Sequence, residues 1–145
     1  MRIFVLLSAI LTLIISGSAL ARDDTDKTYR CTAKDAVDVQ DDGTISALVG
    51  KAFLKDYDKM VIDLKTGRVT YPLTGVREER VVQQTGVFNN EYVLVPSSIF
   101  HRNKAVANAA TDFIRMRTAT SSQPQTLFMV FSLSYLVTGT CEIVP

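Results

Sequence analysis

The chain holds a single histidine, His101, so any Ser-His-Asp arrangement for nucleophilic catalysis would have to use it. Ser97 and Ser98 precede it closely, but no serine stands in a G-x-S-x-G turn. Phosphate-binding glycine motifs are also absent from the sequence. The polar residues 102–104 that follow His101 are typical of a solvated loop. We therefore predict that the protein is not an enzyme, with an enzyme centred on His101 as the alternative.

The two cysteines, Cys31 and Cys141, could form a disulfide, act as a redox pair or bind a metal. Redox pairs normally use the close C-x-x-C spacing, and two cysteines with one histidine are an uncommon zinc set. An even number of cysteines in an exported protein indicates pairing. We predict a Cys31–Cys141 disulfide, no metal site and no cofactor, with two buried free thiols as the alternative.

Arg115 and Arg117, in the segment FIRMR, could bind an anion, because guanidinium groups donate paired hydrogen bonds to carboxylates and phosphates. Their spacing of two puts both side chains on one face of a strand expected over residues 111–118. A solvated outer face explains the same spacing. The sequence thus singles out Arg115 and Arg117 as a candidate surface anion-binding patch.

The first 21 residues have the three-part pattern of a secretory signal peptide. Met1-Arg2 carries a positive charge, residues 3–15 are almost wholly apolar, and Ala19-Leu20-Ala21 matches a small-x-small cleavage site. The apolar stretch of roughly 13 residues is shorter than the about 20 that a spanning helix needs, so a retained anchor is the alternative. We expect residues 22–145 to form one exported domain, periplasmic or extracellular, with no stable membrane anchor after cleavage.

The charge balance argues against a nucleic-acid partner. The chain has 16 Lys and Arg against 15 Asp and Glu, and removing Arg2 with the signal peptide leaves a net charge of zero. Binding to a phosphate backbone needs a surplus of Lys and Arg on one face. We therefore expect no nucleic-acid partner. The β-rich, apolar sequence without a catalytic motif instead favours a small ligand or a protein of the cell envelope as the partner.

The segments that must position these groups alternate between apolar and polar residues, which is typical of half-buried strands. Residues 28–39 form the first such segment, with Cys31 on its apolar face. Two hairpins are expected further along, with strands over residues 60–64, 69–73, 80–85 and 91–95. A short helix is expected over residues 44–57, and residues 97–110 indicate a loop that leads into a second one.

Residues 126–137, TLFMVFSLSYLV, are expected to form a central strand or two strands joined at Ser132–Ser134. The odd positions from Leu127 to Val137 share parity with Cys141, so a continuous pleat would turn them all into the core. Seven or eight short antiparallel strands with one or two helices predict a small β-barrel or sandwich. Pairing of the terminal strands favours the barrel, and an α+β fold with an open sheet is the alternative.

Three segments carry a resemblance to other proteins: TYRC at 28–31, MVIDLKTGRV at 60–69 and TGTC at 138–141. Together they resemble an uncharacterised group of small exported bacterial β-proteins with a YxC start, a V/I-D-x-x-T-G middle and an S/T-G-T-C end. This resemblance implies a bacterial, periplasmic protein. It implies no reaction.

The early YxC strand with a cysteine near the end is also similar to periplasmic inhibitors of c-type lysozyme. Those proteins are small eight-stranded barrels that block their target with a loop of roughly the form S-G-x-K/R-Y. The nearest stretches here, Thr66–Tyr71 and Thr74–Arg77, differ from that form in spacing. No site residue is therefore transferred from this family.

The predicted function is an exported, non-enzymatic binding module of unknown specificity. It would take a small apolar ligand inside the barrel or an envelope protein on its surface, and a filled interior favours the surface. A periplasmic enzyme inhibitor of the lysozyme-inhibitor kind is one alternative. An enzyme that uses His101 is the other.

Overall fold

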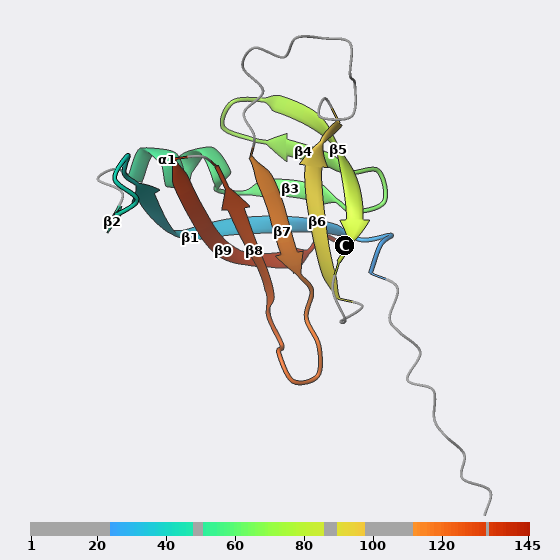
Figure 1. Cartoon of the computed structure of the whole chain (residues 1–145). Coiled ribbons are helices and arrows are strands. Elements are labelled where there is room, and N and C mark those ends of the chain that lie inside the picture. Colours follow the sequence, from blue (N-terminus) through green and yellow to red (C-terminus); the bar gives the residue numbers. More distant parts are fainter. Residues whose placement is uncertain (1–23, 48–50, 86–89, 98–111, 133) are drawn as a thin grey trace, which may run out of the picture.

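The computed structural model describes residues 24–47, 51–85, 90–97, 112–132 and 134–145. Within them lie nine strands and one helix, arranged as in Figure 1. The elements are β1 (Thr28–Val39), β2 (Ile45–Ala47), α1 (Lys51–Tyr57), β3 (Met60–Asp63), β4 (Arg68–Tyr71), β5 (Val76–Gln84), β6 (Glu91–Pro96), β7 (Phe113–Arg117), β8 (Thr126–Phe131) and β9 (Tyr135–Ile143).

Eight of these strands form a closed antiparallel barrel. Their order is β1-β3-β4-β5-β6-β7-β8-β9, and β9 pairs back onto β1. The short strand β2 is paired to the end of β1, where Val39 lies opposite Ile45. The predicted small β-barrel is confirmed. The open-sheet alternative is excluded because the β1–β9 pairing leaves the eight-stranded ring without an edge.

The helix expected over residues 44–57 is shorter than predicted. Strand β2 occupies residues 45–47, and α1 covers only residues 51–57 before the chain enters β3. Lys59, in the turn after α1, has a positive φ of 59°, a left-handed conformation that does not continue a helix. The second helix, expected within residues 97–110, lies outside the described residues apart from position 97.

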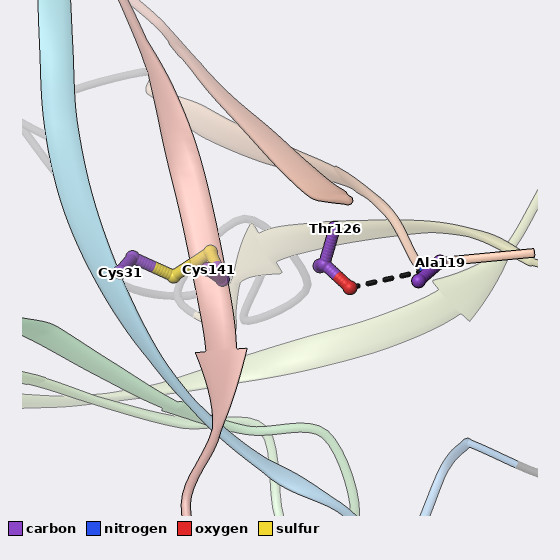
Figure 2. Close-up of a disulfide and its surroundings, with 4 residues drawn as sticks. All are labelled: Cys31, Ala119, Thr126 and Cys141. Atoms are coloured by element: carbon purple, nitrogen blue, oxygen red, sulfur yellow. Dashed lines mark hydrogen bonds between the residues drawn. A yellow bond between two sulfur atoms is a disulfide. The ribbon is translucent and has the colours of Figure 1, made fainter. Parts of the chain in front are cut away.

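The first and last strands of the barrel are joined covalently. Cys31 and Cys141 lie opposite each other in the β1–β9 register and form a disulfide, shown in Figure 2. Both cysteines are buried. The predicted Cys31–Cys141 pairing is therefore present, and it closes the barrel at the seam between the two ends of the sheet.

The apolar run at residues 126–137 forms two strands, β8 and β9, which pair with each other. Odd positions of β9 point inward, as Val137 and Cys141 show. Even positions of β8 do so instead, since Phe128 and Val130 are buried. The expectation of an inward pleat through Leu127, Met129 and Phe131 is wrong, because the chain reverses direction between the strands and the parity changes there.

Large side chains fill the barrel interior. The bulkiest have less than 2% of their surface exposed, and they come from strands all around the barrel: Tyr29, Met60, Ile62, Val69, Tyr92, Leu94, Ile114, Met116, Phe128, Val130 and Val137. Beside the disulfide, the hydroxyl of Thr126 accepts a hydrogen bond of 3.1 Å from the backbone N–H of Ala119 (Figure 2). Such close packing is what holds the barrel strands in one arrangement.

Gly139, in the TGTC segment, lets β9 approach both β1 and Phe128. A Cβ atom at this position would lie 2.2 Å from the carbonyl oxygen of Thr32 and 2.4 Å from the ring of Phe128. Gly139 pairs with Ala33, next to a register shift in β1. The glycine of this segment is therefore required by packing of the barrel wall.

Candidate functional site

Arg80 lies inside the barrel with 4% of its surface exposed. Its neighbours Glu79 and Val81 are exposed, so the alternation of β5 turns Arg80 inward. Its Nη2 donates to both carboxylate oxygens of Asp112, at 3.1 and 3.2 Å, and Nη1 donates to the Asp112 carbonyl oxygen at 3.2 Å. Its Nε also donates to Glu78 at 3.0 Å. One buried guanidinium thus contacts two carboxylates.

Three tyrosines extend this network away from the ion pair. Arg80 Nη2 donates to the Tyr71 hydroxyl at 3.2 Å, and the hydroxyls of Tyr57 and Tyr135 are 2.6 Å apart. The ring of Tyr57 packs edge-on against that of Tyr71, with centroids 5.9 Å apart. We call the whole group the inner cluster; it consists of Tyr57, Tyr71, Glu78, Arg80, Asp112 and Tyr135. It ties α1 and β4 to β5, β9 and the start of β7.

Burial sets the protonation of the inner cluster. It raises the pKa values of Tyr57 and Tyr71 above their ordinary value, so both hydroxyls stay protonated. Burial also raises the pKa of Asp112, against the opposing effect of Arg80. No buried side-chain nitrogen or oxygen of the described residues lacks a hydrogen-bond partner. The buried polar groups of the inner cluster are therefore all hydrogen-bonded within the barrel.

Gly67 and the turn around it position the backbone of Arg80. Gly67 has a positive φ of 71°, and a Cβ there would lie 1.8 Å from the Arg80 carbonyl oxygen. The Arg80 N–H donates to the Gly67 carbonyl at 2.9 Å. Asp63 fixes the turn by accepting hydrogen bonds from the Lys65 N–H at 2.9 Å and the Thr66 hydroxyl at 2.7 Å. The V/I-D-x-x-T-G segment is thus a structural turn.

Burial alone would raise the pKa of Asp63, but hydrogen bonds from Thr66 and Lys65 lower it overall. The carboxylate is therefore ionised at neutral pH and remains a full acceptor for the turn. The turn that presents Gly67 to Arg80 is consequently held in place across the neutral pH range.

Arg115 and Arg117 lie together on the outer face of β7, and both bind Glu91 of β6. Arg115 Nη2 donates to Glu91 Oε2 at 3.0 Å, and Arg117 Nε donates to Glu91 Oε1 at 2.8 Å. Glu91 is 5% exposed. Hydrogen bonds from Arg115 and then Arg117 hold its pKa below the ordinary value, so it is fully ionised at neutral pH. We call these two residues the outer arginine pair.

The outer arginine pair is not neutralised by its carboxylate. Two guanidinium groups share one Glu91, which leaves a local charge of plus one. The side chains of Arg115 and Arg117 are 43% and 44% exposed. Among the described residues Arg115 donates only through Nη2, so Nε and Nη1 are left for solvent or a ligand. The candidate anion patch thus keeps hydrogen-bond donors at the surface.

A hollow of about 80 Å³ adjoins the outer arginine pair on the wall formed by β7 and β8. It is lined by Arg115, Arg117, Leu127, Phe128 and Met129. The strand register explains this lining, because Met129 lies opposite Arg115 and Leu127 lies opposite Arg117. Met129 is 36% exposed. We call this feature the outer hollow.

The apolar surface continues along the same two strands beyond the outer hollow. Phe113 of β7 stacks on Phe131 of β8, with ring centroids 4.8 Å apart and planes inclined by 13°. Phe113 remains 38% exposed. The outer face of β7 and β8 therefore combines exposed apolar side chains with two half-exposed cations.

The sequence indicated the two arginines of this site but not its apolar lining. Arg115 and Arg117 follow from strand parity alone, and the structure places them as expected. A continuous pleat through residues 126–137 predicts that Leu127 and Met129 point inward, whereas the alternative of two strands leaves their direction open; in the structure they face outward. The serines at positions 132 and 134 marked the break that would have turned them outward.

His101 and residues 98–100 just before it lie outside the described residues, whereas Ser97 lies within them. An enzyme that uses His101 therefore stays a prediction. In the described part of the chain no three or more His, Cys, Asp or Glu side chains gather where they could hold a metal ion. No helix among those residues is long and apolar enough to cross a membrane.

Searches of protein-family models, curated proteins and solved structures find no match to this chain. A proposal about its function therefore depends on the residues and geometry described above.

Proposed function

We propose that this chain is an exported, non-enzymatic module that recognises a protein of the cell envelope through the outer face of β7 and β8. The observation that carries the proposal is the outer hollow, where two half-exposed arginines stand beside the exposed Met129. Arginine, methionine and aromatic residues are enriched in protein interfaces. Phe113 and Phe131 extend this composition along the same strands.

The packing of the barrel supports a protein partner over a small ligand held inside. Tyr29, Tyr92 and Phe128 are each no more than 1% exposed and occupy the interior with the other core side chains. A ligand-binding barrel instead keeps a cavity lined by apolar side chains with a few polar groups. The polar groups of the inner cluster are already bonded to one another. The packing therefore favours recognition of a partner at the outer wall over binding of a small ligand inside the barrel.

A photoreactive residue in the outer wall tests this proposal. Residue 129 would be replaced by p-benzoylphenylalanine, and the protein irradiated inside the cells that encode it. Val81 of β5 is a matched control site, because it is 37% exposed and Met129 is 36% exposed. We expect a defined protein adduct from position 129 that position 81 does not give. Equal adducts from both sites, or none from position 129, would count against the proposal.

A second candidate function is inhibition of an enzyme through the β4–β5 hairpin. The tip of this hairpin is exposed and apolar, with Leu73 at 62% and Val76 at 46% exposure, and Arg77 follows. Gly75 adopts a positive φ of 69° at the turn. Titrating a c-type lysozyme with the protein and with Arg77→Ala tests this function. Full lysozyme activity at saturating protein would rule it out.

A further inference from the structure

The charge of the outer arginine pair points to the kind of group that completes it. Glu91 is almost fully buried, and it accepts hydrogen bonds from both guanidiniums at once. The surplus positive charge is exposed at the surface with Arg115 Nε and Nη1 unused by the described residues. A planar guanidinium edge matches a carboxylate with two parallel hydrogen bonds. A second carboxylate would bring the site to two cations and two anions.

The outer hollow supplies the apolar half of the same site. Its volume of about 80 Å³ is several times the roughly 10–15 Å³ of accessible space that one water molecule needs, so the outer hollow is large enough for a small aliphatic side chain. Leu127, Phe128 and Met129 form its apolar lining next to the two arginines. Methionine adapts its shape to a bound group. An apolar side chain placed there would lie next to Arg115, which lines the same hollow.

Glu91 makes this arrangement rigid before any partner arrives. It holds Arg115 through Nη2 and Arg117 through Nε, so each side chain has lost part of its rotamer freedom already. The pKa of Glu91 is lowered by these bonds, so the carboxylate stays ionised at neutral pH. Preorganised arginines lose less entropy when a ligand binds. Glu91 is thus a positioning residue for the outer arginine pair.

We infer that the outer hollow binds an acidic peptide segment of the partner, with one aliphatic side chain in the hollow and a neighbouring carboxylate on Arg115 and Arg117. This inference rests on the proposed function and names the chemistry of the partner. A polyanion such as nucleic acid or a lipid surface is a poorer fit, because one surplus charge cannot neutralise a row of phosphates. The aliphatic lining likewise matches a side chain better than a phosphate.

Selection from an unbiased peptide library tests the inference. Random heptapeptides would be displayed in two forms, one internal and one with a free C-terminus, and selected on the full exported domain. We expect enrichment of peptides that place Leu, Ile or Met within two positions of Asp, Glu or the terminal carboxylate. The two display forms tell a side-chain carboxylate from a terminal one. Enrichment of basic or purely apolar peptides, or no enrichment, would overturn the inference.

Matched variants locate the binding of an enriched peptide. Arg115→Gln should weaken its affinity about fivefold, the order expected for a half-exposed charge-assisted contact. Arg30→Gln, on the exposed face of β1, should change it less than twofold. Raising the salt concentration from about 0.05 M to about 0.5 M should weaken the wild type more than Arg115→Gln. Equal losses in Arg115→Gln and Arg30→Gln would refute binding at the outer arginine pair.

Three further outcomes show how this inference and the proposed function stand relative to each other. A protein crosslinked at position 129 through a segment without an acidic residue would refute the inference and leave the proposed function standing. Absence of any protein adduct at position 129 would refute both the inference and the proposed function. A dimer in sedimentation that Met129→Lys dissociates would show that a second copy covers this face, which also overturns the acidic-peptide inference.

Discussion

The two arginine sites of this barrel have opposite ratios of cation to carboxylate. Inside, Arg80 alone contacts Glu78 and Asp112, and its side chain is 1% exposed. Outside, Arg115 and Arg117 share Glu91 and are more than 40% exposed. The inner site has one negative charge in excess when its groups are ionised. The outer site has one positive charge in excess.

Burial explains why the two sites differ. A guanidinium removed from water must place its N–H groups on acceptors within the protein, because unpaired buried donors are costly. Arg80 does so with two carboxylates, a carbonyl oxygen and a tyrosine hydroxyl. A half-exposed arginine keeps water on its remaining donors and can exchange that water for a partner. The inner cluster therefore serves stability, and the outer arginine pair remains open to binding.

Arg80→Met should have the largest effect of the substitutions that separate the two sites. It leaves the buried Asp112 and the partly exposed Glu78 without their cation. Breaking the buried Arg80–Asp112 pair in this way costs about 3–5 kcal/mol of unfolding free energy. Urea denaturation followed by circular dichroism measures the loss. Arg30→Met on the exposed face of β1 is the control and should change stability by less than about 0.5 kcal/mol. A loss below about 1 kcal/mol for Arg80→Met would mean that the inner cluster is not structural.

The barrel itself could be predicted from the sequence because local rules determine it. Alternation over residues 28–39 turned Cys31 inward, and the even cysteine count gave its pairing with Cys141; the structure contains both features. The outward direction of Arg115 and Arg117 followed from the same alternation. Period-two patterning is a property of neighbouring residues, so it needs no knowledge of the partner strands.

The contacts between distant residues could not be predicted in this way. Glu91 lies 24 positions before Arg115, and Arg80 lies 32 positions before Asp112. These pairs form because of the registers of strands β5 to β7, and a shift of one residue would turn each side chain to the other face. The sequence shows Arg80 only as one charged residue in a polar strand. Its burial depends on the turn at Gly67 and on Asp112 reaching the same end of the barrel.

Replacing one carboxylate at each arginine site should show the effect of their different ratios of cation to carboxylate. Glu91→Gln leaves two cations without their shared anion, and we expect a loss of about 1–2 kcal/mol from these charged hydrogen bonds. Asp112→Asn leaves Arg80 with Glu78 as a balanced pair, so its loss should be less than about 1 kcal/mol. Urea denaturation of both variants at neutral pH gives the comparison. A larger loss for Asp112→Asn than for Glu91→Gln would contradict the charge count.

The pH dependence of stability should have opposite signs at the two sites. The pKa of Glu91 is lowered, so its stabilisation is present above its ordinary value of 4.5 and is lost as the pH falls through the lower folded value. The pKa of Asp112 is raised by burial, so its ionisation costs stability as the pH rises above 3.8.

Urea denaturation from acid to neutral pH measures this difference. The stability gap between wild type and Glu91→Gln should narrow toward low pH. The stability of wild type should rise relative to that of Asp112→Asn as the pH falls, because protonation of Asp112 removes the cost of a buried charge. If the unfolding free energies of the three proteins changed in parallel with pH, neither Glu91 nor Asp112 would have a shifted pKa in the folded state.

Arg115→Met should have the smallest effect on folding. Its guanidinium is 43% exposed and makes one hydrogen bond among the described residues, so its loss should cost less than about 1 kcal/mol. Arg117 still pairs with Glu91 in this variant and keeps the carboxylate satisfied. The same substitution should reduce capture of a partner at position 129 about fivefold, as expected for the loss of one half-exposed charge-assisted contact. A variant that folds as well as wild type but loses its partner would show that surface arginines here are kept for binding, whereas Arg80 is kept for the fold.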